Sequence, residues 1–309
     1  MLDFRMESFL AVCRHMNYTR AAEELNLTQP AVSQHIRWLE EYYAAPLFHY
    51  TNKRLSLTPA GQLLLTAATT VQHDQAQLKR QMQQTLQHPQ DLRFGVTPTV
   101  GMYLLPGPLA QYHRTYPQAN LFLQVSNTQS LCEQLDRGEL DFAIVEGYVR
   151  KRDYDTLLYC SEPYLAVCAA DYPLEGEPRC LADLLGHPLI IREPGSGNRE
   201  IITRSLNRSN LDLSDFRGLL EVGDMHVLKQ LMLMGCGIGF LYRCAVAEDL
   251  AQGRLRALHL QDMQECNDIT FLWRKGSVFA QDYQRLFQLL RPEVSENHTC
   301  SSSVQPKSL

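Results

Sequence analysis

The sequence lacks any run of eighteen apolar residues, so no segment is long and apolar enough to be a membrane-spanning helix. The first nine residues carry Asp3, Arg5 and Glu7 where a secretory signal peptide would be apolar. At 309 residues, with 45% hydrophobic and 20% charged residues, the chain is long enough for two or three globular domains. We therefore expect a cytoplasmic protein with more than one domain.

Motifs of common enzyme classes are also missing. There is no GxSxG nucleophile elbow, no phosphate-binding P-loop and no GxGxxG between a strand and a helix. The stretch GCGIGF at 235–240 resembles a nucleotide loop, but it leads into an apolar run instead of opening a helix. The nine cysteines form no CxxC and no Cys/His cluster, so we expect no metal, no cofactor and mostly buried thiols. No catalytic residue is predicted, and an enzyme is disfavoured.

The sequence also lacks an excess of positive charge. The formal net charge is -5, divided into +1 over residues 1–90 and -6 over the rest. Affinity for DNA comes largely from neutralised phosphates. If the N-terminal part binds DNA, one copy should bind weakly and would need to act at least in pairs.

Helical spacing of apolar residues is present in the first forty residues. Residues 9–16 mark a first helix. Thr19 is the expected N-cap of a short second helix over 20–26. Thr28 is the expected N-cap of a third helix, with Pro30 in the first turn, where its missing N–H costs nothing.

The two faces of this third helix differ in character. Val32, Ile36 and Leu39 fall within an apolar stripe of about 60°, which should pack inward. Another face carries side chains that can hydrogen-bond base edges, and it begins at the helix N-terminus, whose free N–H groups favour phosphate. A helix, a tight turn and a polar-faced helix predict a DNA-binding helix-turn-helix. The expected DNA contacts on this helix are Thr28, Gln29, Pro30, Ser33, Gln34 and Arg37.

A short hairpin is predicted next, because residues 47–58 alternate apolar and polar side chains. Its tip carries Lys53 and Arg54. Such a wing would lie beside the third helix and could touch a phosphate or the minor groove.

A long helix is predicted from Pro59 to about His88, spanning roughly 40 Å. Its outer faces are rich in Gln, Lys and Arg, so pairing with a second chain is favoured over packing on its own domain. A weak coiled-coil seam is marked by Leu64, Ala68, Val71, Leu78, Met82 and Leu86.

Beyond residue 91, short apolar runs alternate with helical stretches. This order predicts an α/β fold with a largely parallel sheet. The polar tail at 295–309 is expected to be disordered. The strand candidates are LRFGV, LFLQVS, DFAIVEG, YLAVCAA, PLIIRE, GLLEVG, GIGFLYR and ITFLWRK.

The stretch NYTRAAEELNLTQPAVSQHIRWLEEYYAAPLF, followed by LSLTPAG, resembles the LysR-type transcriptional regulators in residue types and spacing. The resemblance continues through LLPGPLAQYHRTYP, RGELDFAIVEG, LADLLGHPLIIRE and GCGIGF, so it covers nearly all of the chain except the tail. One residue departs from the family pattern. Tyr50 stands where most members have Arg, which removes one expected phosphate contact and leaves Lys53 and Arg54 to compensate.

The resemblance implies an all-α winged helix-turn-helix with a long linker helix, followed by an α/β, periplasmic-binding-protein-like sensor of two subdomains. It also implies homodimers or homotetramers on double-stranded DNA, a small-molecule effector, and RNA polymerase as a further partner. The implied boundaries are 1–58 for the DNA-binding domain, 59–90 for the linker helix and 91–294 for the sensor, with subdomain I at about 92–163 and 268–292 and subdomain II at about 164–267.

Effector contacts are expected in loops that follow strands and open helices, where free N–H groups favour an anion. The loop REPGSGNRE is the strongest candidate, because Gly195 and Gly197 let the backbone approach a ligand. Thr99 and Asp224 could instead be ordinary helix caps. The expected effector contacts are Thr97, Pro98, Thr99, Asn127, Thr128, Ser196, Gly197 and Asn198.

Three other functions were weighed. An enzyme lacks its motifs, and a plain solute-binding protein is disfavoured by the N-terminal motif. A thiol redox sensor of the same family is the remaining alternative, since Cys160 and Cys168 are eight residues apart. Peroxide-sensing relatives carry their cysteine pair in the segment that matches about 196–210, which has no cysteine here. A small-molecule effector is therefore favoured, and we expect it to be an anion.

Overall fold

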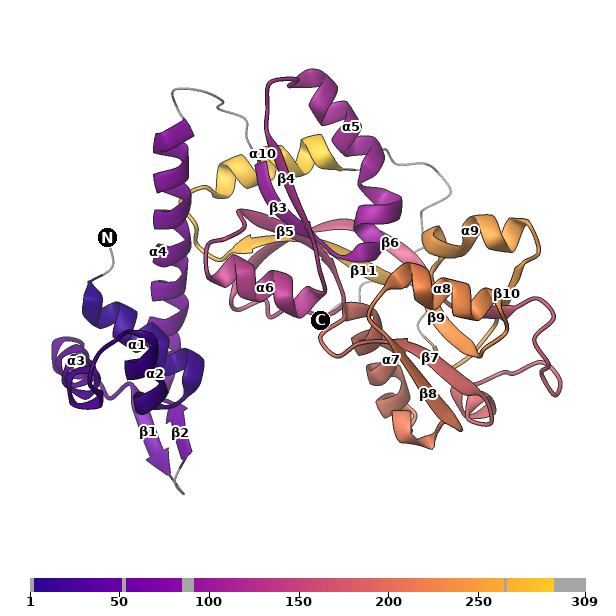
Figure 1. Ribbon diagram of the computed structural model, residues 1–309, viewed down its shortest axis with the longest axis horizontal. Coiled ribbons are helices and arrows are strands. Elements are labelled where there is room, and N and C mark those ends of the chain that lie inside the picture. Colours follow the sequence, from indigo (N-terminus) through magenta and orange to yellow (C-terminus); the bar gives the residue numbers. More distant parts are fainter. Residues whose placement is uncertain (1–2, 52–53, 85–91, 264–265, 292–309) are drawn as a thin grey trace, which may run out of the picture.

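The computed structural model describes residues 3–51, 54–84, 92–263 and 266–291 (Figure 1). A helical head and a larger α/β body are joined by one long helix, α4 (Pro59–Gln84). Lys53 and the 295–309 tail lie outside the described residues. No helix in the described ranges combines the length and the apolar character that crossing a membrane requires.

The head has the predicted winged helix-turn-helix arrangement. Val32, Ile36 and Leu39 are buried in its core, as the periodicity predicts. The expected cap of the second helix was wrong. Asn17 caps it instead, because its side-chain oxygen accepts from the backbone N–H groups of Thr19 and Arg20 in the first turn of the helix. The elements are α1 (Phe4–His15), α2 (Tyr18–Glu24), α3 (Gln29–Tyr42), β1 (Phe48–Thr51) and β2 (Arg54–Leu57).

The body is built on one continuous sheet with the strand order β4-β3-β5-β11-β6-β9-β7-β8, and β10 pairs with β6. All eight predicted strands are present. β10 and the first half of β6 were not predicted, and β6 runs unbroken for 16 residues. The strands are β3 (Leu92–Val96), β4 (Leu121–Val125), β5 (Phe142–Glu146), β6 (Tyr154–Ala169), β7 (Pro188–Arg192), β8 (Gly218–Val222), β9 (Ile238–Tyr242), β10 (Leu255–Leu258) and β11 (Cys266–Arg274).

The sheet divides into two lobes. In lobe I, β3 is parallel to β4 and β5; in lobe II, β7 is parallel to β8 and β9. The long strands β6 and β11 run antiparallel to their neighbours and connect the lobes. The sheet is therefore mixed, and the predicted parallel pairing holds only within each lobe.

Helices cover both lobes. Asp224 caps α8, as one of the two alternatives predicted, by accepting from the N–H of Val227 at 2.9 Å. The helices are η1 (Val100–Leu104), α5 (Pro106–Thr115), α6 (Thr128–Asp136) and α10 (Ala280–Leu290) in lobe I, and η2 (Leu181–Leu184), α7 (Gly197–Arg208), η3 (Leu213–Asp215), α8 (Met225–Leu233) and α9 (Arg243–Ala251) in lobe II.

One face of α4 packs against lobe I of its own chain (Figure 1). Thr70 donates to the carbonyl of Lys275 at 3.0 Å, and buried His73 donates from Nε2 to the carbonyl of Leu140 at 3.0 Å. Arg80 donates to the carbonyl of Gly138 at 2.7 Å. The sequence favoured pairing of this helix with a second chain over packing on its own domain. For this face that expectation was wrong, because its polar residues find partners in lobe I.

The predicted seam of α4 does not act as one surface. Leu64 and Ala68 pack into the core of the head, and Leu86 lies outside the described residues. Val71, Leu78 and Met82 are exposed in the single chain. Among the seam residues that the structure describes, these last three are the exposed ones that could meet a second chain.

Candidate functional sites

The N-terminal half of α3 presents the predicted DNA-contacting side chains to solvent. Thr28 caps the helix by accepting from the N–H of Ala31 at 3.4 Å. Gln29 is exposed, and its amide donates to the Ser33 hydroxyl at 2.9 Å, which holds both on one face. Pro30, Gln34 and Arg37 are exposed as well.

Few cations on the head remain free for phosphate. Arg5 and Arg14 are engaged by carboxylates of the head itself. Arg37 and Arg54 form no ion pair with another described residue, and neither does Arg20 at the start of α2. The sequence analysis missed Arg20, because no periodic signal separates an unpaired surface arginine from a paired one.

The loops predicted to hold the effector bring the two lobes together. Asn127 caps α6 by accepting from the N–H of Ser130 at 2.9 Å, and its amide donates to Glu193 of lobe II at 3.2 Å. The backbone N–H of Gln129 donates to the carbonyl of Gly195 at 3.1 Å. The predicted loops therefore form the junction between lobes.

Gly197 serves this junction by being small. A Cβ there would lie 2.1 Å from the carbonyl oxygen of Glu146, so a larger residue would push the lobes apart. Thr128 donates to the same carbonyl at 2.8 Å. The backbone of Gly197 thus approaches the other lobe, and its expected contact with a ligand stays a prediction.

Two of the side chains expected as donors beside Gly197 behave differently. The amide of Asn198 already donates to the carbonyl of Phe240 at 3.1 Å. Ser196 is buried at the N-terminus of α7, but its hydroxyl does not cap that helix. Of the two residues, Ser196 is therefore the one whose hydroxyl is left to donate to a ligand.

Thr97 and Thr99 are fully buried at the end of β3. The Thr97 hydroxyl has no hydrogen-bond partner among the described residues, and the Thr99 hydroxyl makes no well-formed hydrogen bond there, although it lies close enough to Glu146 to lower the pKa of that carboxyl. Thr99 precedes η1 without capping it through its side chain, so the capping alternative is wrong. Pro98, between them, is half-buried.

Three further buried groups also lack a partner among the described residues: both carboxylate oxygens of Glu146, Nη1 of Arg192 and the hydroxyl of Tyr242. Each is the last residue of its strand. The carboxyl ends of the parallel strands of an open sheet are where α/β folds bind ligands. We call these three residues with Thr97 and Thr99 the interlobe cluster.

Glu146 dominates the electrostatics of this cluster. Burial raises its pKa to about 7, against the lowering effects of the Thr99 hydroxyl and of Arg192. Arg192 donates Nε and Nη2 to Glu193 at 2.8 and 3.0 Å. The sequence analysis took Glu146 and Arg192 only as strand ends. A charged residue closing an otherwise apolar strand was the signal that could have identified them.

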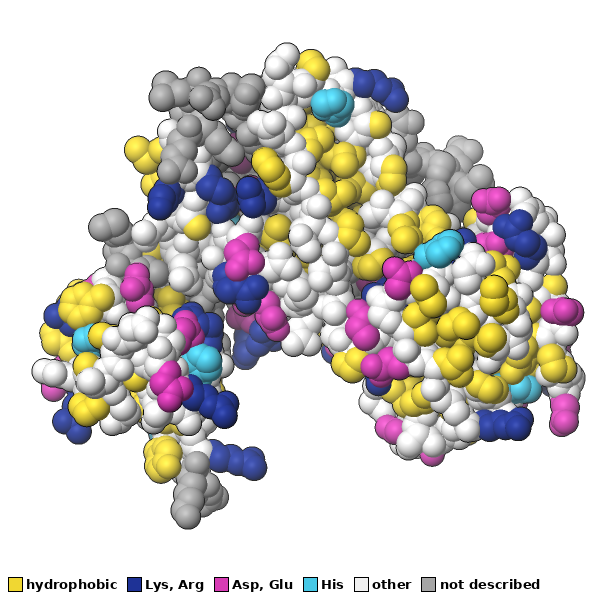
Figure 2. Space-filling model, in the orientation of Figure 1, with side chains coloured by type: hydrophobic (Ala, Val, Ile, Leu, Met, Phe, Trp, Pro, Cys, Tyr) yellow, Lys and Arg dark blue, Asp and Glu magenta, His cyan; other side chains and the backbone are white. Residues whose placement is uncertain are grey.

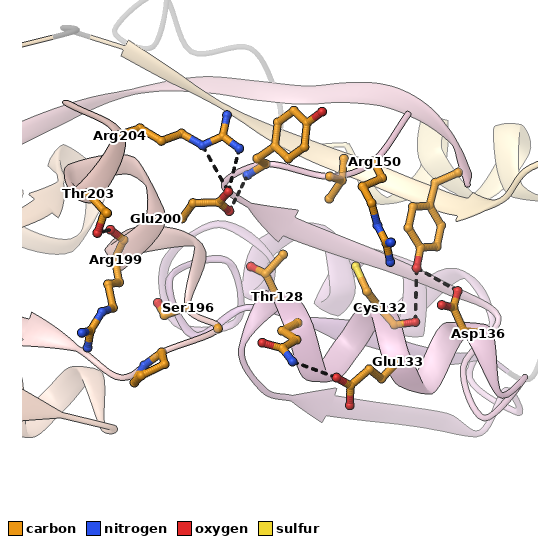
Figure 3. Close-up of a pocket in the computed structure, with 16 residues that line it drawn as sticks. Thr128, Cys132, Glu133, Asp136, Arg150, Ser196, Arg199, Glu200, Thr203 and Arg204 are labelled. Atoms are coloured by element: carbon orange, nitrogen blue, oxygen red, sulfur yellow. Dashed lines mark hydrogen bonds and ion pairs between the residues drawn. The ribbon is translucent and has the colours of Figure 1, made fainter. Parts of the chain in front are cut away.

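A pocket of about 680 Å³ lies beside the junction, lined by α6, α7 and the loop after β5 (Figure 3). Thr128 and Ser196 border it, but the interlobe cluster does not. Its charged groups are mostly satisfied within the protein: Arg204 pairs with Glu200 at 2.8 Å, and Asp136 pairs with Arg274 at 2.6 Å. The unpartnered polar groups therefore favour the cluster over this pocket.

The cysteines give little support to a redox pair. Cys160 and Cys168 lie on the same strand, β6, eight residues and so about 26 Å apart, too far for a disulfide. Both thiols are free, and burial raises the pKa of Cys160 to about 12. Cys266 is disulfide-bonded. No reactive Cys160–Cys168 pair is formed.

A head with an exposed helix-turn-helix and a two-lobed body with a polar junction define a DNA-binding protein that carries a ligand-binding domain. Residues 5–62 match the family described as bacterial regulatory helix-turn-helix protein, lysR family, and residues 87–295 match the LysR substrate binding domain. The chain belongs to the LysR family of transcriptional regulators. It is thus a DNA-binding regulator with an effector-binding domain.

Relatives resemble the chain over most of its length. It is 29% identical to the transcriptional activator CmpR of Synechocystis, covering 90% of this chain and 92% of that protein. It is 28% identical to OxyR of Escherichia coli, covering 94% of each. Among solved structures, the CcmR regulatory domain of Synechocystis in complex with 2-PG has a TM-score of 0.57 at 23% identity, covering 65% of this chain and 97% of that one.

Proposed function

We propose that this regulator binds its operator through α3 and the β1–β2 wing, and that a small molecule with an anionic group, bound at the lobe junction, controls that binding. The observation that carries the effector site is the interlobe cluster, whose buried donors lack partners among the described residues. Unsatisfied buried groups are costly unless a ligand or water pairs with them.

The thiol redox sensor is the weaker candidate, because the suggested cysteines lie far apart on one strand. We also propose that the DNA-binding domain covers residues 1–58, the linker helix 59–90 and the sensor 91–294. We further propose that the regulator works in the cytoplasm and contacts RNA polymerase.

Assembly into homodimers or homotetramers is part of the same proposal. It is supported by the exposed apolar residues of α4 and by apolar side chains gathered over the α8 region of lobe II (Figure 2). Those on or beside α8 include Val227 and Met234. A dimer would also offset the few free cations of a single head, because two heads double the phosphate contacts.

The test begins with the operator. Full-length protein is mixed with sheared genomic DNA of its source, and the retained fragments are sequenced to identify the bound sites. A thermal-shift screen of small carboxylates, sulfonates and inorganic anions then identifies an effector, and gel shifts show whether it changes operator binding. An effector that is wholly apolar or a simple cation would overturn the anionic part of the proposal.

Variants locate the site by calorimetry with the effector identified in that screen. Thr97→Ala and Thr99→Ala, which alter the interlobe cluster, should each weaken effector binding several-fold. A loss in Ser196→Ala alone would place the effector in the neighbouring pocket instead. Thr203→Ala is the matched control, because this hydroxyl on α7 already donates to the carbonyl of Arg199 at 2.9 Å. Unchanged affinity in both test variants would place the site elsewhere.

A further inference from the structure

Glu146 and Arg192 form an unusual pair of buried, opposite charges that do not meet. Each side chain is about 1% exposed. Arg192 is near enough to lower the pKa of Glu146, yet no ion pair joins the two. Both carboxylate oxygens of Glu146 and Nη1 of Arg192 are left without a partner among the described residues. The Glu146 carboxylate therefore needs a hydrogen-bond donor, and Nη1 of Arg192 needs an acceptor.

The charges at the junction do not suit a simple anion. Arg192 already gives two of its three nitrogens to Glu193, so its positive charge is largely balanced there. When Glu146 is ionised, the three side chains together carry one net negative charge. An anion bound at this place would add a second buried negative charge without a cation to pair with it, which is costly.

We propose that the effector is a small zwitterion whose ammonium group binds the Glu146 carboxylate and whose own carboxylate binds Nη1 of Arg192. This inference rests on the proposed function and specifies its effector. An ammonium group offers three donors, which Glu146 can accept with both oxygens. A carboxylate accepts from the guanidinium. Thr99 and Tyr242 lie close enough to Glu146 for a hydrogen bond or a charge to act between them. The N–H of Thr97 donates to the carbonyl of Ile144, on the strand that ends at Glu146. The hydroxyls of these three residues are therefore near enough to complete the bonds of the effector's carboxylate.

The competing possibility is an anion that binds while Glu146 is protonated, and pH separates the two. The other titratable or charged groups whose charges act on Glu146, or respond to it, are Arg192 and Glu193 at the end of β7, Tyr164 on β6, Tyr242 on β9 and Cys244 on α9. Burial raises the pKa of both tyrosines and of Cys244, so none of these three ionises near neutrality. Affinity for a zwitterion should rise between pH 6 and pH 8 as Glu146 ionises, whereas affinity for an anion should fall.

The experiment uses the full-length protein and three matched sets of probes. These are L-amino acids, the carboxylic acids that lack their amino group, and the amines that lack their carboxylate. Thermal shifts rank the probes, and calorimetry measures the best member of each set. The expected result is that an amino acid binds at least about ten-fold more tightly than its two matched fragments, because each fragment leaves one buried charge unpaired.

Glu146→Gln keeps the shape of the side chain and removes its charge. It should reduce affinity for the amino acid at least about ten-fold and abolish the rise in affinity between pH 6 and pH 8. Glu133→Gln is the control, since this carboxylate on α6 lines the neighbouring pocket and lies outside the cluster.

Each outcome has a distinct meaning. Tighter binding by a carboxylic acid than by its amino acid, or affinity that falls with rising pH, overturns the zwitterion and leaves the proposed anionic effector standing. Binding by amines alone overturns both. No binding by any amino acid overturns the zwitterion, and the wider anion screen then decides the proposed function separately.

Discussion

Gln29 and Arg37 are the residues of α3 best suited to contact bases. Both are exposed on its polar face, and neither packs into the head core. We expect Gln29→Ala and Arg37→Ala to weaken operator binding by about 1–3 kcal/mol each, the usual cost of a lost base contact. Gel shifts measure the loss, and circular dichroism should show an unchanged fold. Wild-type affinity in both variants would exclude this face from DNA recognition.

Glu146 should also give the ligand-free protein a pH-dependent stability. Its pKa is raised from the ordinary 4.5 to about 7 in the folded state, so the folded protein holds a proton that the unfolded chain releases. This contribution is present below about pH 4.5 and is lost as the pH rises through 7, by about 3 kcal/mol in total.

Urea unfolding at pH 5 and pH 8 checks that sign. The free energy of unfolding of Glu146→Gln should fall less over this interval than that of the wild type. Glu133→Gln should follow the wild type. Equal slopes for Glu146→Gln and the wild type would mean that Glu146 titrates normally.

Among the elements, the β1–β2 wing offers a gain-of-function test. Tyr50 is 74% exposed on β1, at the position where the resemblance to the family predicts Arg. Tyr50→Arg should tighten operator binding and steepen the slope of log K against log salt by about 0.9 per head. Tyr42→Arg is the matched control, because this exposed tyrosine ends α3, far around the helix from Gln29. Equal gains in both variants would mean a general charge effect and no specific wing contact.

The contact between α4 and lobe I depends on Asp74. Its carboxylate accepts from the Ser277 hydroxyl at 2.6 Å and from the N–H of Val278 at 2.9 Å. Burial alone would raise the pKa of Asp74, but hydrogen bonds from His73, Ser277 and Val278 outweigh it and hold the pKa below its usual value. Asp74→Ala should therefore lower the free energy of unfolding by about 2–3 kcal/mol.

Urea denaturation of the full-length chain measures this loss. Asp282→Ala is the control, because Asp282 is an exposed carboxylate on α10 with only a distant ion pair to Arg285. A cost for Asp74→Ala no larger than that of the control would mean that the α4 contact contributes little to stability.

For the whole molecule, the prediction concerns assembly. Val71 and Leu78 are 47% and 50% exposed on the side of α4 that lobe I leaves uncovered. Val71→Glu and Leu78→Glu should each shift the full-length protein toward monomers, because a buried carboxylate in an apolar interface lacks a partner. Sedimentation velocity at micromolar concentration reports the change. Leu289→Glu, at an exposed position on α10, should leave the oligomer intact, and a wild-type sedimentation coefficient for both α4 variants would place the interface elsewhere.

The sequence by itself determined the features that depend on a few neighbouring residues. The buried stripe of α3, the Thr28 cap and the eight predicted strands follow from periodicity and capping, which act within one or two turns. The Asn17 cap was missed because Asn17 and Thr19, two residues apart, are both good capping residues for one helix start. The fold class also followed from the order of these local elements.

Only the tertiary structure decided which distant residues meet. Glu146 and Arg192 end strands in different lobes, and no local pattern indicates that both become buried beside one another. Gly197 matters because it approaches a carbonyl of the other lobe. The position of α4 depends on polar partners about 200 residues away in the sequence. The physical reason is that burial and charge pairing depend on how the lobes close, whereas sequence periodicity reports only which face of each element is apolar.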